Sequence, residues 1–207
     1  MPEPSGTLNA IIIRKYDGLT HEHKKRPPDH SFDALSWVLL ARAGNRDFRR
    51  PLKFLYSNGA GEFVCTDGHR MHVANIGKYA PIIPEGCWEV VHADPVKMVL
   101  GSATEDSFFA YAHLFEKAEA AAKTTKRKAV VYSIRDNGNR ESLSFIFGIF
   151  KATGRAFNTQ YAADAFKGQD SMVVSTEDTD DMKPIFFVSE GSESIPTRRA
   201  IIMPLKV

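Results

Sequence analysis

The residues best suited by type to bind a metal lie near the amino terminus: His21, Glu22, His23 and His30. Imidazole and carboxylate groups are common ligands of zinc. The site would nevertheless be poor, because a run of three basic residues, 24–26, follows His23 directly and adjacent positive charge disfavours a bound cation. We therefore expect no metal site. A metal-dependent nuclease or hydrolase that uses His21, His23 and His30 stays as the least favoured alternative.

The chain also lacks the common signatures of catalysis. It contains no GxSxG, phosphate-binding loop, GxGxxG or HExxH pattern. Its only cysteines, Cys65 and Cys87, form no CxxC pair and no zinc spacing, so we expect two reduced, buried thiols, as in a cytoplasmic protein. The amino terminus does not resemble a signal peptide, and no apolar run approaches the ~20 residues that span a bilayer. The sequence predicts a non-enzymatic cytoplasmic protein with no catalytic residues, no cofactor and no membrane contact.

The most informative polar segment is Thr66–Met71, which reads TDGHRM. Asp67-Gly68 predicts a tight turn, after which His69 and Arg70 project at the start of a strand. A polar rim beside an apolar Met71 could bind a short peptide that carries one polar and one apolar anchor. The alternative is an ordinary hairpin with a solvated arginine.

Two clusters of basic residues follow predicted helices. The net charge is only +2, with 27 basic and 25 acidic residues, so any positive surface must be local. Such clusters are typical either of a solvated surface or of sequence-independent contact with DNA phosphates. The candidate DNA-facing residues are Arg42, Arg46, Arg49, Arg50, Lys123, Lys126, Arg127 and Lys128.

The first half of the chain predicts a strand, a helix and three strands. Ile-rich residues Leu8–Arg14 favour a strand, and apolar residues from Phe32 to Ala43 recur at helical spacing before Gly44. Turn residues then separate three further strands. These are Leu52–Ser57, Glu62–Thr66 and Met71–Ile76, followed by a strand at Trp88–Val91 and a short helix from Asp94 to Leu100.

A similar order recurs in the second half. The secondary structure of Asp106–Lys128 is ambiguous. Composition favours a helix from about Leu114 onward, whereas Ser107–Leu114 could instead form an aromatic strand. Phe157–Phe166 predicts a helix. The remaining predicted strands are Ala129–Ile134, Ser142–Phe150, Met172–Ser175, Ile185–Ser189 and Ala200–Pro204.

Three separate regions of the chain, residues 63–100, 157–164 and 202–207, contain segments that resemble the bacterial DNA sliding clamps, the beta subunits of DNA polymerase III. FVCTDGHRM, ending at Met71, is similar to the family's ATDGHRL signature, and Val90–Leu100 resembles its following strand and helix. FNTQYAAD, residues 157–164, resembles the FNxxYxxD helix of the last clamp domain, and the closing IMPLKV is similar to VMPMRL. The resemblance implies an α+β clamp fold of repeated βαβββ units, with helices on one face of antiparallel sheets.

The resemblance also implies a peptide-binding pocket between two domains. Polymerases and repair proteins insert a short linear motif there in the family. The matching positions here are Thr66, Gly68, His69, Arg70 and Met71, with Met203, Pro204 and Leu205 opposite. Met71 and Leu205 keep the pocket apolar but alter its shape relative to the family.

The chain departs from the family in length. A full beta clamp chain has three domains, and two chains close a ring, whereas 207 residues suffice for two small domains, 1–105 and 106–207. A six-domain ring would then require a homo-oligomer of three copies. We expect a clamp-like protein that tethers replication or repair proteins to duplex DNA without reading its sequence. The alternative is a clamp-derived interaction module, phage-borne or carried on a mobile element, that does not encircle DNA.

Overall fold

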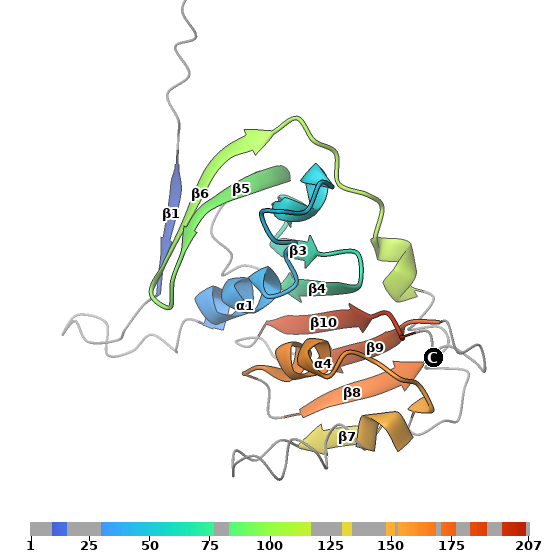
Figure 1. Ribbon diagram of the computed structural model, residues 1–207. Coiled ribbons are helices and arrows are strands. Elements are labelled where there is room, and N and C mark those ends of the chain that lie inside the picture. Colours follow the sequence, from blue (N-terminus) through green and yellow to red (C-terminus); the bar gives the residue numbers. More distant parts are fainter. Residues whose placement is uncertain are drawn as a thin grey trace, which may run out of the picture.

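Ten strands form one antiparallel sheet in the order β1-β6-β5-β2-β3-β4-β10-β9-β8-β7 (Figure 1). The structure is a computed structural model that describes residues 10–15, 30–76, 83–116, 130–133, 148–151, 153–168, 171–176, 183–189 and 196–205. The strands of the first half are β1 (Ile11–Arg14), β2 (Leu55–Ser57), β3 (Glu62–Thr66), β4 (Arg70–Asn75), β5 (Gly86–Ala93) and β6 (Lys97–Thr104). Those of the second half are β7 (Val130–Ser133), β8 (Ser171–Thr176), β9 (Ile185–Ser189) and β10 (Thr197–Ile202).

The chain contains the predicted βαβββ unit twice. The first unit is β1, helix α1 (His30–Leu39), β2, β3 and β4, and the second is β7, helix α4 (Thr159–Phe166), β8, β9 and β10. A short 3-10 turn, η2 (Arg50–Lys53), precedes β2. The two units join edge to edge, because β10 pairs with β4 along its whole length. In the sheet the β5–β6 hairpin separates β1 from β2.

Alternating side chains of the strands enter two different cores. On one face Phe63 and Phe187 pack with Leu35 of α1 and Phe166 of α4, so both helices cover the same face of the sheet (Figure 1). On the other face a second cluster covers the centre of the sheet. Its buried members are Val64, Met71, Val73, Tyr111, Phe115, Phe186 and Ile201. This alternation is the period of two expected of β-strands.

The ambiguous segment after Asp106 is neither a long strand nor a helix throughout. Residues 106–111 have no regular structure and residues 112–116 form a helical turn, while the rest of the predicted helix lies outside the described residues. Tyr111 and Phe115 are buried against the second cluster. Packing on the sheet therefore decides the course of this segment.

The predicted helix from Asp94 to Leu100 is wrong. Asp94 makes a tight turn instead, because its Oδ1 accepts hydrogen bonds from the backbone N–H groups of Val96 and Lys97 at 2.8 and 2.7 Å. Met98 and Leu100 are then buried in β6, which pairs with β1 and β5. The resemblance to the family's strand and helix thus fails here at its helical part.

The predicted strand Ser142–Phe150 is also wrong where it can be compared. Residues 148–150 are helical, and residues 142–147 lie outside the described residues. Ile149 is buried in the helix-side core and accepts a hydrogen bond from Thr153 Oγ1 at 2.9 Å. A short apolar run is compatible with either structure until its packing is known.

In the described ranges, no helix combines the length and apolar character needed to cross a membrane.

Candidate functional site

The Thr66–Met71 segment and the end of the chain lie side by side. In the β4–β10 pair, Arg70 lies opposite Ile202 and Met71 opposite Ile201. Directly beyond β10, the backbone N–H of Met203 donates to the carbonyl oxygen of His69 at 2.8 Å. The sheet therefore brings together two segments that are more than a hundred residues apart in sequence, at the junction of its two units.

Side-chain hydrogen bonds hold the Asp67-Gly68 turn in one shape. Asp67 Oδ1 accepts from the backbone N–H groups of His69 and Arg70 at 2.9 and 3.0 Å. Thr66 Oγ1 accepts from Gly68 N–H at 3.0 Å and donates to the Arg70 carbonyl at 2.6 Å. Gly68 has a φ of +87°, a conformation that glycine adopts without strain. The turn is thus preorganised by the residues of its own motif.

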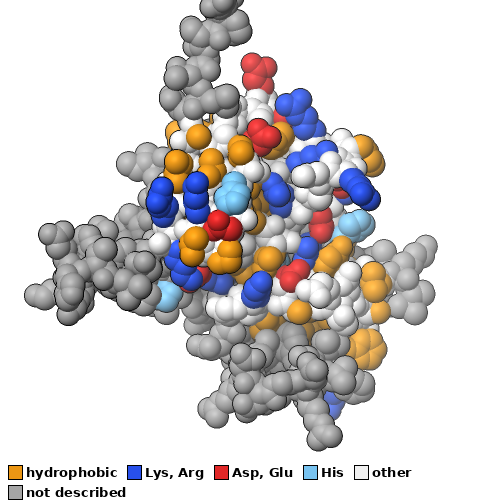
Figure 2. All heavy atoms as spheres, turned by 60° about the vertical axis from the view of Figure 1, so that its left-hand side comes forward, with side chains coloured by type: hydrophobic (Ala, Val, Ile, Leu, Met, Phe, Trp, Pro, Cys, Tyr) orange, Lys and Arg blue, Asp and Glu red, His pale blue; other side chains and the backbone are white. Residues whose placement is uncertain are grey.

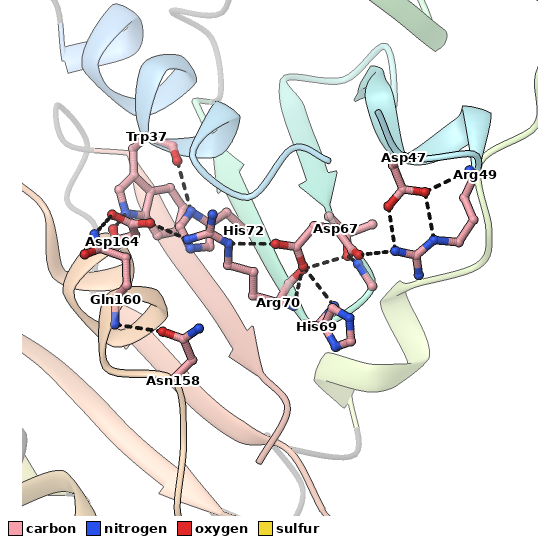
Figure 3. Close-up of polar contacts among 12 residues, drawn as sticks. Trp37, Asp47, Arg49, Asp67, His69, Arg70, His72, Asn158, Gln160 and Asp164 are labelled. Atoms are coloured by element: carbon pink, nitrogen blue, oxygen red, sulfur yellow. Dashed lines mark hydrogen bonds and ion pairs between the residues drawn. The ribbon is translucent and has the colours of Figure 1, made fainter. Parts of the chain in front are cut away.

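Arg70 is committed to contacts within the protein. Its Nε donates to Asp67 Oδ2 at 3.1 Å and its Nη1 forms an ion pair with Asp164 Oδ2 (Figure 3). Its guanidinium also lies 4.3 Å from the ring centre of Tyr161. Its side chain is only 12% exposed. Arg70 therefore joins the turn to helix α4 rather than presenting a free charge.

His69 and the end of the chain supply the accessible groups. The His69 ring is exposed and forms no hydrogen bond to a described residue, while Met203 and Leu205 are 38% and 53% exposed. Leu205 is held in place by its backbone N–H, which donates to the Ala156 carbonyl at 2.8 Å. Thr66 and Met71 are buried, Pro204 is half-buried and Gly68 is exposed. This surface offers an imidazole beside apolar side chains.

Sequence reasoning missed the residues that brace this site from α1 and α4. Trp37 Nε1 donates to the carbonyls of Asp164 and Ala165 at 2.9 and 3.0 Å. The Trp37 ring stacks on His72 with centroids 4.2 Å apart, and His72 Nδ1 donates to the Trp37 carbonyl at 2.9 Å. Burial lowers the pKa of His72 to about 4, so its ring is neutral at physiological pH. The YxxD spacing in FNTQYAAD was the available signal for Asp164.

The predicted basic cluster after α1 is only partly free to bind DNA. Arg42 Nη1 donates to the Val90 carbonyl at 3.4 Å, and Arg49 donates to both carboxylate oxygens of Asp47. Arg50 pairs with Asp106 at 3.2 Å but keeps 70% of its side chain exposed, and Arg46 is exposed. The other predicted residues, Lys123, Lys126, Arg127 and Lys128, lie outside the described residues.

The two helices that cover the sheet, α1 and α4, contribute no lysine or arginine. The basic side chains that contact them come from other segments of the chain, such as Lys15, Arg70 and Arg198. On the β1, β6 and β5 side, Lys and Arg side chains lie among hydrophobic and acidic ones (Figure 2). Exposed Ile12, Val91 and Val96 belong to this end of the sheet. Exposed cations of the described residues therefore lie on other elements, such as Arg14 of β1 and the loop residue Arg46, rather than on α1 or α4.

Of the four residues considered as metal ligands, only His30 is described; His21, Glu22 and His23 lie outside the described residues. Within the described ranges, no three His, Cys, Asp or Glu residues are grouped so as to hold a metal ion. Cys65 and Cys87 are buried and form no disulfide.

Solved structures with a similar fold are bacterial DNA sliding clamps. The chain aligns over 100% of its length with 68% of a Pseudomonas aeruginosa sliding clamp, the DNA polymerase III subunit beta, bound to griselimycin, with a TM-score of 0.52 and 12% identity. It aligns equally with 68% of the Caulobacter (C. crescentus) beta sliding clamp, with a TM-score of 0.49 and 14% identity. No protein-family model and no curated protein sequence matches the chain.

Proposed function

This chain has the fold of the bacterial beta sliding clamps, and on that premise we propose that it is a non-enzymatic clamp-like protein of DNA replication or repair. It tethers partner proteins to duplex DNA through a peptide site formed by residues 66–71 and 203–205. The observation that carries the proposal is the β4–β10 junction, where the Met203 N–H binds the His69 carbonyl at 2.8 Å.

The residues of the proposed peptide site have different roles. His69 is the exposed polar contact, and its imidazole can bind an amide side chain of the peptide. Met203 and Leu205, which are exposed, and Pro204, which is half-buried, supply apolar contact suited to aliphatic or aromatic anchors. Thr66, Gly68 and Arg70 set the shape of the turn, while Met71 supports the strand from the second core.

For the contact with DNA we propose the loops beside α1, with Arg46 and Arg50 as the most accessible cations and Arg42 and Arg49 as secondary contacts. Such contacts would be sequence-independent and would weaken steeply with salt. We also propose the division into domains 1–105 and 106–207, so that the first domain would hold one βαβββ unit with the β5–β6 hairpin and the second domain the other unit. Since β1 and β7 are the outer strands of the sheet, three copies joined through them would give a six-domain ring.

The peptide site is tested by fluorescence anisotropy with a labelled hexapeptide that carries one glutamine and two large apolar residues. We expect saturable binding, weakened about tenfold by His69→Ala because one hydrogen bond to the peptide is lost. A variant with Val96→Ala, an exposed residue of the distant β5–β6 hairpin, should bind normally. Absence of saturable binding to the wild-type protein would refute the peptide site.

The ring is tested by mass and topology. A protein that encircles DNA should have the mass of three chains in light scattering, stay bound to nicked circular DNA, and slide off after the circle is linearised. The absence of Lys and Arg from α1 and α4 is the observation behind the second candidate function, an interaction module that does not encircle DNA. A monomer that binds the peptide but is not retained on circles would establish that second function.

A further inference from the structure

The most exposed large apolar side chain among the described residues is Phe48, at 91%. It lies in the segment 44–50, named here the loop 44–50, which follows α1 and ends at the first residue of η2, and basic residues flank it in sequence. A phenylalanine in this position gains nothing from burial in the folded chain, so the fold itself does not account for it. The exposure of Phe48 therefore indicates that this loop contacts another molecule.

The loop is held rigid by Asp47. Its backbone N–H donates to the Gly44 carbonyl at 3.0 Å, and its carboxylate accepts from Arg49 N–H at 2.8 Å and from the Arg49 guanidinium at 2.7 and 3.0 Å. These bonds from Arg49 lower the pKa of Asp47 to about 2, which keeps the carboxylate ionised. A fixed turn presents Phe48 without the entropic cost of ordering a mobile loop on binding.

The same loop contacts the proposed peptide site. Arg49 Nη2 donates to the Asp67 carbonyl at 2.8 Å (Figure 3). A side chain at Gly68 would collide with Arg49 Nη1. A peptide bound at His69 and continuing past Gly68 would therefore pass directly onto the loop 44–50. The two surfaces are continuous, with Arg49 as the bridge between them.

The charge of the loop indicates what it would bind. Asp47 neutralises Arg49, whereas Arg46 is exposed with no ion pair to a described residue, and Arg50 keeps 70% of its side chain exposed beside Asp106. An aromatic ring between two accessible cations complements an apolar residue flanked by carboxylates. The two cations are those proposed above for contact with DNA, so a bound acidic peptide would compete with DNA for them.

We propose that the loop 44–50 extends the peptide site and binds an acidic segment, carrying one large apolar residue, that flanks the short motif of a partner protein. This proposal rests on the proposed peptide site. Phe48 contacts the apolar residue of the flank, and Arg46 and Arg50 bind its carboxylates. The loop thus selects among partners that share the same motif.

The test compares the hexapeptide described above with versions extended by Asp-Asp-Phe at either end, and with a version extended by Lys-Lys-Phe. We expect one acidic extension to tighten binding by about five- to thirtyfold, the effect of adding one buried aromatic contact. Phe48→Ala and the pair Arg46→Glu with Arg50→Glu should abolish this gain and leave the affinity for the unextended peptide unchanged. Phe150→Ala, which removes a phenylalanine that is 47% exposed and lies outside the loop 44–50, serves as the control.

The outcomes separate the two proposals. If the unextended peptide does not bind, both the peptide site and its extension are overturned. If it binds but neither acidic extension tightens binding, or the gain survives Phe48→Ala, only the extension is overturned. A labelled single-stranded 20-nucleotide DNA is the third probe. Loss of its binding in Phe48→Ala, with the gain from the acidic peptide retained, would assign the loop to nucleic acid instead.

Discussion

The ion pair between Arg70 and Asp164 connects the turn of the candidate site to α4, and Asp164→Asn tests its importance. The substitution keeps the size of the side chain and removes its charge. Asp164 binds Arg70 through Oδ2 and accepts from Gln160 Nε2 through Oδ1 at 2.9 Å. Arg70 would keep its bond to Asp67 at 3.1 Å. The variant therefore weakens the contact between the two units but leaves the Arg70 side chain bound to Asp67.

The magnitude follows from the burial of the pair. The two side chains are 12% and 16% exposed, so solvent screens their attraction only weakly. Removing one partner of a buried pair costs about 3–5 kcal/mol, and a hydrogen bond to a charged group contributes about 1.5–3 kcal/mol. Because Asp67 still neutralises Arg70, we expect Asp164→Asn to lower the free energy of unfolding by about 2–3 kcal/mol.

Urea unfolding followed by circular dichroism and by tryptophan fluorescence measures this loss, and the slope of the transition checks that both variants unfold alike. Asp33→Asn is the matched control, because its ion pair with Lys15 is exposed at 46% and 40% and should contribute at most about 1 kcal/mol. A cycle with Arg70→Met should give a coupling energy of about 1–3 kcal/mol. A loss below about 0.5 kcal/mol, or additive effects in the cycle, would refute the assigned role of the pair.

Three further predictions concern the same region. Gly68→Ala should lower the free energy of unfolding by about 1–3 kcal/mol, because a side chain is strained at φ +87° and displaces Arg49. Gly44→Ala should change stability little, because a Cβ at Gly44 has no atom within 4 Å. Chemical unfolding compares the two variants, and equal effects would contradict the turn geometry. The pKa of His72 falls from 6.5 to about 4 on folding, so its contribution to stability is complete above pH 6.5 and is lost as the pH falls towards 4, by about 3 kcal/mol in total. Unfolding at several pH values should therefore show a shallower loss for His72→Gln, and identical profiles would exclude this residue as the cause. Burial raises the pKa of the Cys65 and Cys87 thiols. Neither thiol should therefore react with a disulfide reagent at pH 8 until urea unfolds the protein. Rapid reaction of the native protein would show that the core opens.

The sequence by itself predicted the elements whose signals are local. The strands Glu62–Thr66 and Ile185–Ser189 have the predicted bounds, since turn residues border each run of buried side chains. The helix predicted at Phe157–Phe166 begins two residues later, where the Asn158 side chain accepts from Gln160 N–H at 3.0 Å as its cap. The repeated βαβββ order and the meeting of TDGHRM with the final strand also follow from sequence, through the resemblance to sliding clamps.

Only the tertiary structure decided what depends on contacts between distant residues. Val96 to Leu100 has a composition compatible with a helix or a strand, and pairing with β1 and β5 selects the strand. Arg70 looked available to a ligand until the fold brought Asp164, 94 residues away, against it. Capping, turn and spacing signals act over a few residues, whereas burial and ion pairing depend on which segments the sheet brings together. That is the physical reason why the sequence could locate this site but not say which of its side chains are free to bind.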